Sequence, residues 1–166
     1  MFREMRRKRQ LLPQEEALAI LTRASSGVLA AAGDGGYPYA VPLSFVYREG
    51  KLYFHCAKSG HKLDALRRCP KASFCVVDQD QVVPEKYTTL YRSVVAFGTV
   101  RILTEEAEIR RAAACLGEKY NPGGEGLQQE IDREFPALCM LEFTIEHLTG
   151  KESRELARLR EEKNPG

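Results

Sequence analysis

The part of this 166-residue chain richest in groups that could do chemistry is the stretch over residues 54–62. It is expected to run from the end of a strand into the start of a helix, with Ser59 as the N-cap. Gly60, His61 and Lys62 would then occupy the first helical turn, where cations are unfavourable because a helix N-terminus carries partial positive charge. We predict a phosphate site here, because the turn combines free backbone amides with the ammonium of Lys62 and the imidazole of His61, and Gly60 permits close approach. The alternative is a surface helix whose first turn is not optimised.

A second candidate, His55, lies just before this turn on a predicted strand. Alternation places Leu52, Phe54 and Cys56 on one face of that strand, so His55 lies on the more polar face. An imidazole at the end of a strand could donate a proton to a bound ligand, because its unperturbed pKa is about 6.5. The alternative is an ordinary hydrogen-bonded histidine on the surface.

Pro42 falls in the middle of another predicted strand, over residues 39–48. Because proline has no amide hydrogen to donate to a neighbouring strand, this strand is expected to have a free edge over residues 41–44. A planar ligand could contact the backbone exposed there. The alternative is a β-bulge.

The elements that must position these residues follow from the pattern of apolar and turn residues. Strands are predicted over residues 28–32, 39–48, 51–56, 71–78, 90–103 and 138–148, with a polar connection over residues 79–89. Helices are predicted over residues 13–23, 59–69, 107–120 and 127–134, and a charged helical tail over residues 151–166. This order predicts one α+β domain over residues 1–166, built around a closed or nearly closed antiparallel sheet, since closure removes exposed strand edges.

The net charge of +2 is concentrated in a basic N-terminal arm, residues 1–12. Residues 1–10 contain five basic side chains and one acidic side chain, so the remainder of the chain carries −2. A body so close to neutral argues against a nucleic-acid-binding protein. The arm itself could contact phosphate, remain solvated or pack on a partner subunit.

Several familiar kinds of site are absent from the sequence. It has neither the glycine-rich motifs of P-loops and dinucleotide-binding folds nor the nucleophile elbow of α/β-hydrolases. The five cysteines form no C-x-x-C pair, and no metal site is expected. No apolar run reaches the roughly 18 residues of a membrane span, and we interpret the chain as cytoplasmic.

Taken together, these features resemble the flavin-binding split-barrel superfamily typified by pyridoxamine 5′-phosphate oxidase, and most closely its 5-nitroimidazole resistance (Nim) branch. The likeness extends over almost the whole chain. The segments that carry it are residues 5–10, 27–30, 36–43, 53–57, 60–62, 87–94, 97–98 and 149–151.

The resemblance implies a mostly β, six-stranded antiparallel split β-barrel with flanking helices. It also implies a homodimer with FMN bound at the subunit interface. By the family pattern, the isoalloxazine ring would be lined by Val41, Pro42, Leu43 and Ser44. Both the ring and the ribityl chain would contact His55, Cys56 and Ala57. The phosphate would be held by Gly60, His61 and Lys62. Ser93 and Tyr91 would also contact the flavin.

Two departures bear on the activity that the resemblance implies. The oxidases usually have an arginine where this chain has His61, and their C-terminal arginine-containing substrate motif is missing. We therefore expect an FMN-dependent oxidoreductase that reduces small nitro-aromatic or quinone-like acceptors, with His55 as the catalytic residue. The alternatives are a pyridoxamine 5′-phosphate oxidase-like enzyme, or a non-catalytic flavin- or haem-binding or sensor protein with His55, His61 or His147 as axial ligand.

Overall fold

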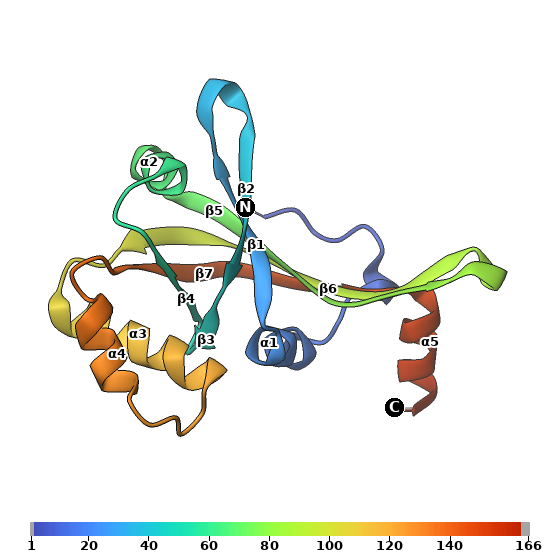
Figure 1. The fold of residues 1–166 in the computed structure, drawn as a ribbon. Coiled ribbons are helices and arrows are strands. Elements are labelled where there is room, and N and C mark those ends of the chain that lie inside the picture. The colour runs from blue at the N-terminus through green and yellow to red at the C-terminus, as the bar shows by residue number, and fades with distance from the viewer. Residues whose placement is uncertain (1, 164–166) are drawn as a thin grey trace.

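The computed structural model describes residues 2–163 and confirms a mostly β chain with flanking helices. One antiparallel sheet, in the order β2-β1-β5-β6-β7-β4-β3, forms its centre (Figure 1). The strands are β1 (Ser26–Ala32), β2 (Pro38–Ser44), β3 (Val46–Arg48), β4 (Lys51–Cys56), β5 (Lys71–Val83), β6 (Thr88–Ile102) and β7 (Cys139–Glu152). The helices are α1 (Gln14–Arg23), α2 (His61–Arg68), α3 (Glu106–Tyr120), α4 (Leu127–Glu134) and α5 (Arg154–Lys163), and none of these is long and apolar enough to cross a membrane.

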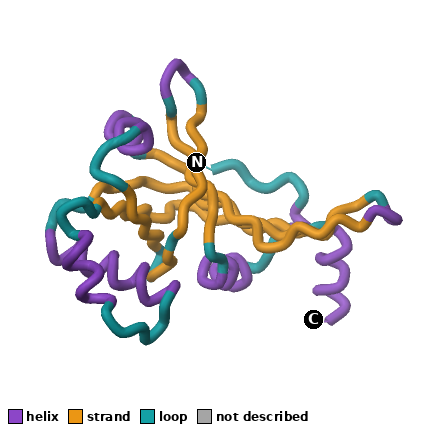
Figure 2. The backbone as a smooth tube through the Cα atoms, in the orientation of Figure 1, coloured by secondary structure: helices purple, strands orange, loops and turns teal. Residues whose placement is uncertain are grey.

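Apolar alternation along the strands fills the interior of the curved sheet. The fully buried phenylalanines come from β4, β5, β7 and the β2–β3 junction, and their rings pack together with leucines from α1, β1 and α2. The helices lie around this strand body, with α1 and α2 beside the inner core (Figure 2). A separate apolar cluster lies between α3 and the outer face of β4 and β7. It fixes the α3–α4 pair to the sheet.

The predicted strand over residues 39–48 is two strands, so the sheet has seven strands rather than six and is not closed. The break occurs at Phe45, whose side chain is fully buried. The backbone N–H of Phe45 donates to the Tyr120 hydroxyl (2.9 Å), and its carbonyl accepts from Lys119 Nζ (2.8 Å). Side chains of α3 therefore replace the strand partner at this residue, which no local pattern could signal.

The predicted polar connection over residues 79–89 is also wrong. Beyond a bulge after Val77, β5 and β6 continue to pair as far as Val83 and Thr88, with the short turn η3 (Pro84–Lys86) between them. The resulting hairpin extends away from the body of the molecule (Figure 1). None of the residues from 77 to 93 is buried, so the alternation that marks a half-buried strand is missing.

At the base of the same hairpin, β7 pairs with β6 and runs to Glu152, beyond its predicted end at residue 148. Glu152 is fully buried and accepts hydrogen bonds from Arg92 (3.2 Å) and Arg160 (2.7 Å). The ion pair with Arg160 ties α5 to the end of the strand. The predicted helical tail therefore begins at Arg154 instead of Lys151, and its last three residues lie outside the described residues.

The N-terminal arm lies along the same region of the chain. Leu11 forms a bridge with Lys151, and the backbone N–H of Leu12 donates to the carbonyl of Gly150 (3.0 Å). The side-chain amide of Gln10, in the short turn η1 (Lys8–Gln10), donates to the carbonyl of Glu152 (2.9 Å). Of the roles considered for the arm, free solvation is thus excluded for its C-terminal part, which packs on β7.

Candidate functional site

The start of α2 has the geometry expected of an anion site, although its details differ from the prediction. The N-cap is Gly60 rather than Ser59, and it makes no side-chain capping bond. Its φ of 131° is one that side chains rarely adopt, and a Cβ there would meet no atom within 4 Å. Among the described residues, the Gly60 carbonyl accepts from the amides of Leu63 and Asp64, which leaves those of His61 and Lys62 at the open end of the helix.

Residues of the β1–β2 hairpin hold His61 in place. Its ring lies against that of Tyr39, with centroids 4.1 Å apart, and its Nε2 is 3.4 Å from a carboxylate oxygen of Asp34. Arg68, on the last turn of α2, contacts the other oxygen of Asp34 at 2.5 Å. These contacts join the tip of the hairpin to α2, so that β2 and the anion site form one surface.

The structure confirms the free edge predicted at Pro42, because β2 pairs only with β1 and is the first strand of the sheet. The side chains of Val41 and Leu43 are partly buried against the core, whereas those of Pro42 and Ser44 are exposed. β2 also contacts β4 without pairing to it. A flat ring could lie along this edge and bond to backbone groups.

The end of β4 contributes the next group of predicted residues. His55 and Ala57 are exposed, while Cys56 is half-buried opposite Cys139 of β7. Burial raises the pKa of the Cys56 thiol to about 12, and the nearby Lys62 only partly opposes this shift. Cys56 is therefore a neutral thiol at physiological pH.

Beside His55 the structure contains an apolar cavity that the sequence did not predict. It has a volume of about 570 Å³ and lies between the end of β4 and the α3–α4 pair. Its walls include Leu116, Ile131, Leu138 and Met140, and the rim carries Glu130 and Glu134. The amphipathic pattern of α3 and α4 could have indicated an apolar face, but only tertiary packing shows that this face meets His55.

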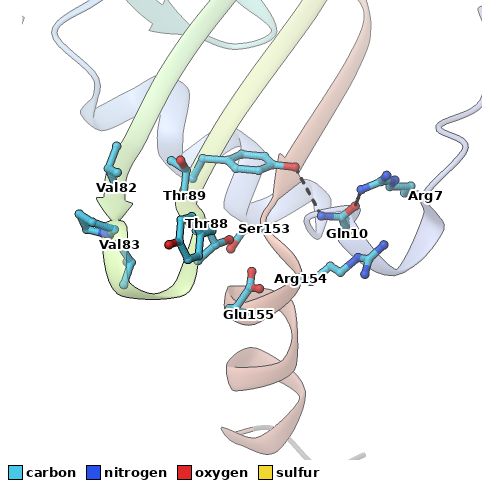
Figure 3. Close-up of a pocket in the computed structure, with 12 residues that line it drawn as sticks. Arg7, Gln10, Val82, Val83, Thr88, Thr89, Ser153, Arg154 and Glu155 are labelled. Atoms are coloured by element: carbon cyan, nitrogen blue, oxygen red, sulfur yellow. Dashed lines mark hydrogen bonds between the residues drawn. The ribbon is translucent and has the colours of Figure 1, made fainter.

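Tyr91 and Ser93 are not near the other predicted flavin residues in the same chain. They lie on β6, at the base of the projecting β5–β6 hairpin, where Ser93 pairs with Val77 and Lys151. Tyr91 lines a different cavity, of about 670 Å³, formed by the hairpin, η1 and the start of α5 (Figure 3). None of the predicted flavin residues of β2, β4 or α2 lines that cavity. One chain thus brings together residues 41–44, 55–57 and 60–62 but leaves Tyr91 and Ser93 apart.

Known structures share this arrangement of strands and helices. A candidate 5-nitroimidazole antibiotic resistance protein from Bacteroides thetaiotaomicron is 20% identical, with 86% of each chain covered and a TM-score of 0.75. An FAD-binding protein from Mesorhizobium loti is 25% identical over 87% of this chain and 97% of its own, with a TM-score of 0.63. An FAD- and haem-binding protein from Mycobacterium smegmatis is 23% identical over 88% of this chain and 74% of its own, with a TM-score of 0.72. The fold is therefore that of the split-barrel proteins, several of which bind flavins.

Comparison of the sequence with family patterns identifies the family as well as the fold. It belongs to the pyridoxamine 5′-phosphate oxidase family, whose pattern matches residues 13–152. This match and the likeness to the Bacteroides protein confirm the resemblance found from the sequence motifs. No curated protein matches the chain significantly.

Proposed function

We propose that this protein binds FMN between two copies of the chain and reduces small nitro-aromatic or quinone-like acceptors. The observation that carries the proposal is the open N-terminus of α2, with its two free amides, Lys62 and His61, beside the free edge of β2. The helix end suits a phosphate, and the strand edge suits a flat ring. Bound flavin would take two electrons from a donor and pass them to the acceptor.

The second copy is proposed because one chain leaves the site incomplete. Ser93 lies on the outer face of β5 and β6, where Val77 is 62% exposed and Phe97 is 40% exposed. Val28 of β1, which is 39% exposed, extends this apolar face. An apolar sheet face of this kind is typical of an interface. A homodimer formed through it would bring Ser93 of one chain towards the flavin held by the other.

The acceptor would lie in the apolar cavity beside His55. Its walls suit a small neutral ring, because apolar side chains gain free energy by removing such a ring from water. The exposed imidazole of His55 at its edge would orient the acceptor and donate a proton as negative charge develops on it.

The roles of His55 and Lys62 can be separated by substitution. His55→Ala should lower the rate of nitro-aromatic reduction and leave the Kd for FMN close to that of the wild type. Lys62→Ala should raise the Kd for FMN and leave the turnover of the flavin-saturated protein nearly unchanged. Lys86→Ala, which removes an exposed lysine from η3, is the charge-matched control. If both site variants lose only thermal stability, the two roles are wrong.

Haem is a second candidate cofactor, favoured by the exposed His55 at the edge of an apolar cavity. The two remaining axial-ligand candidates are already engaged, since His61 lies against Tyr39 and the ring of His147 stacks on Phe2 at 4.7 Å. A haem held by His55 would give a Soret band that His55→Ala abolishes. Flavin absorbance without a Soret band would eliminate this candidate.

A further inference from the structure

The two ends of the chain form a strongly basic cavity that the proposed flavin site does not use. Its volume is about 540 Å³, and six of its lining residues carry positive charge: Arg6, Arg7, Lys8, Arg9, Arg154 and Arg158. Glu161 is the one acidic residue that lines it. We call this cavity the basic groove.

The fold holds both walls of the groove in place. The N-terminal wall is fixed to β7 through Gln10, Leu11 and Leu12. The C-terminal wall is α5, which is held by the ion pair between Arg160 and the buried Glu152. Segments from opposite ends of the sequence therefore keep like charges close together as part of the folded structure.

Most of this positive charge has no counter-ion among the residues that the structure describes. Lys8 pairs with Glu4 at 3.0 Å, but within residues 2–163 the arginines at positions 6, 9, 154 and 158 make no ion pair. Arg154 also occupies the first turn of α5, where the helix dipole disfavours a cation. Converging like charges cost free energy, which a bound anion would offset.

The basic groove adjoins the cavity lined by Tyr91. At the boundary Arg7 donates to the side-chain oxygen of Gln10 (3.5 Å), whose amide donates to the Tyr91 hydroxyl (3.4 Å). Both cavities share Arg7, Gln10 and Arg154, which lie together at their junction (Figure 3). Beyond this junction the Tyr91 cavity offers hydroxyl groups from Thr88 and Thr89 and the carboxylate of Glu155. These groups can bond to sugar hydroxyls and to an amide.

We propose that the basic groove binds the diphosphate of a reduced nicotinamide dinucleotide, whose nicotinamide end extends through the shared junction towards Tyr91. The proposal rests on the proposed function, in which Ser93, two residues from Tyr91 on β6, approaches the flavin held by the other chain. The dinucleotide is then the electron donor. Its dihydronicotinamide C4–H bond breaks, the ring is oxidised to the pyridinium, and the hydride with its electron pair goes to the flavin.

The shape of the site favours such a small anion over a nucleic acid. Each cavity has a volume in the range of roughly 300–1,000 Å³ typical of small-molecule sites. The charge lies in one groove and not along a stripe, and the chain beyond the first ten residues carries −2. A duplex or an extended single strand would need basic side chains over a longer surface.

The test is the double variant Arg6→Gln/Arg158→Gln, because both side chains line the groove away from the shared junction. Calorimetric titration with NADP⁺ should give a Kd about 10- to 100-fold above that of the wild type, as expected for the loss of one or two charge-assisted hydrogen bonds. Inorganic pyrophosphate should compete with NADP⁺ for the wild-type protein. The Kd for FMN should be unchanged, and the Tm of the ligand-free protein should not fall, because the variant also removes two of the like charges that converge in the groove.

Arg48→Gln/Arg111→Gln is the matched control, since it removes the same charge from a different part of the surface. It should bind NADP⁺ as the wild type does. Equal affinities of wild type and groove variant for NADP⁺ would overturn the proposal. So would an oligonucleotide or anionic vesicles that bind in the groove while NADP⁺ does not. A groove-dependent NADP⁺ affinity in a protein that binds no flavin would support the groove and refute the proposed function instead.

Discussion

Replacing Gly60 by alanine tests the anion site at its most constrained residue. Gly60 has φ 131° and ψ 167°, a region that is essentially restricted to glycine. Because a Cβ at this position would meet no atom within 4 Å, the cost of the substitution comes from the backbone alone. That cost is about 1–3 kcal/mol. In a chain of this length it corresponds to a fall in Tm of about 2–12 °C.

The same substitution should weaken FMN binding. Alanine can relieve the strain only by rotating the peptide that leads into α2, which moves the free amides of His61 and Lys62. A hydrogen bond to a charged phosphate contributes about 1.5–3 kcal/mol, so the loss of one should raise the Kd for FMN by about tenfold or more. Fluorescence titration with FMN and thermal melts of the flavin-free protein measure the two effects separately.

Gly50→Ala is the matched control, because Gly50 also has a positive φ, 79°, and open space around its Cβ position. It lies in the turn between β3 and β4, away from α2, so this variant should lose stability and keep the wild-type Kd for FMN. Gly60→Ala would refute the reasoning if its Tm fell while its affinity for FMN stayed at the wild-type value. In that case the phosphate is held somewhere else.

Three further predictions follow from buried ionisable groups. Burial lowers the pKa of Lys119 to about 8. The unfolded chain therefore binds the lysine proton more tightly than the folded chain does. Between pH 8 and 10 the free energy of unfolding should rise more steeply in the wild type than in Lys119→Met. Equal slopes in urea titrations of the two proteins would contradict this. Because burial raises the pKa of Cys56 to about 12, its thiolate fraction at pH 8 is about 1,000-fold below that of an ordinary thiol. An aromatic disulfide reagent should therefore leave Cys56 unmodified in the native protein. Mass mapping of the treated protein tests this. Glu152→Gln leaves Arg92 and Arg160 without their buried partner and should lower the unfolding free energy by about 3 kcal/mol in urea; a loss below about 1 kcal/mol would show the pair to be unimportant.

The sequence predicted those elements whose signals are local. The proline and acidic residues at the start of α1, the alternation along β7 and the bounds of α4 all agree with the structure to within a few residues. The errors arose where tertiary contacts decide the outcome. The strand break at Phe45 depends on Lys119 and Tyr120, and the outer part of the β5–β6 hairpin contains no buried residue.

The same distinction between local signals and tertiary contacts applies to the candidate site. The free edge at Pro42 follows from the backbone chemistry of proline, and the structure contains it. A helix start was predicted beside His61 and Lys62, but with Ser59 as its N-cap, whereas the structure has Gly60 there. The apolar cavity beside His55 could not be predicted, because α3 and α4 reach it only through the packing of the whole fold. Tyr91 lines a different cavity from the one beside His55, and no local pattern in the sequence could have indicated that separation.

The most direct test of the flavin site combines an absorbance spectrum of the purified, undenatured protein with mass identification of the chromophore released on denaturation. The spectrum should show flavin bands that correspond to about one cofactor per chain. The released compound should have the mass of FMN, and Lys62→Ala should retain less of it than Lys86→Ala. A colourless protein that does not bind added FMN, or one that retains FMN equally well in both variants, would contradict the account.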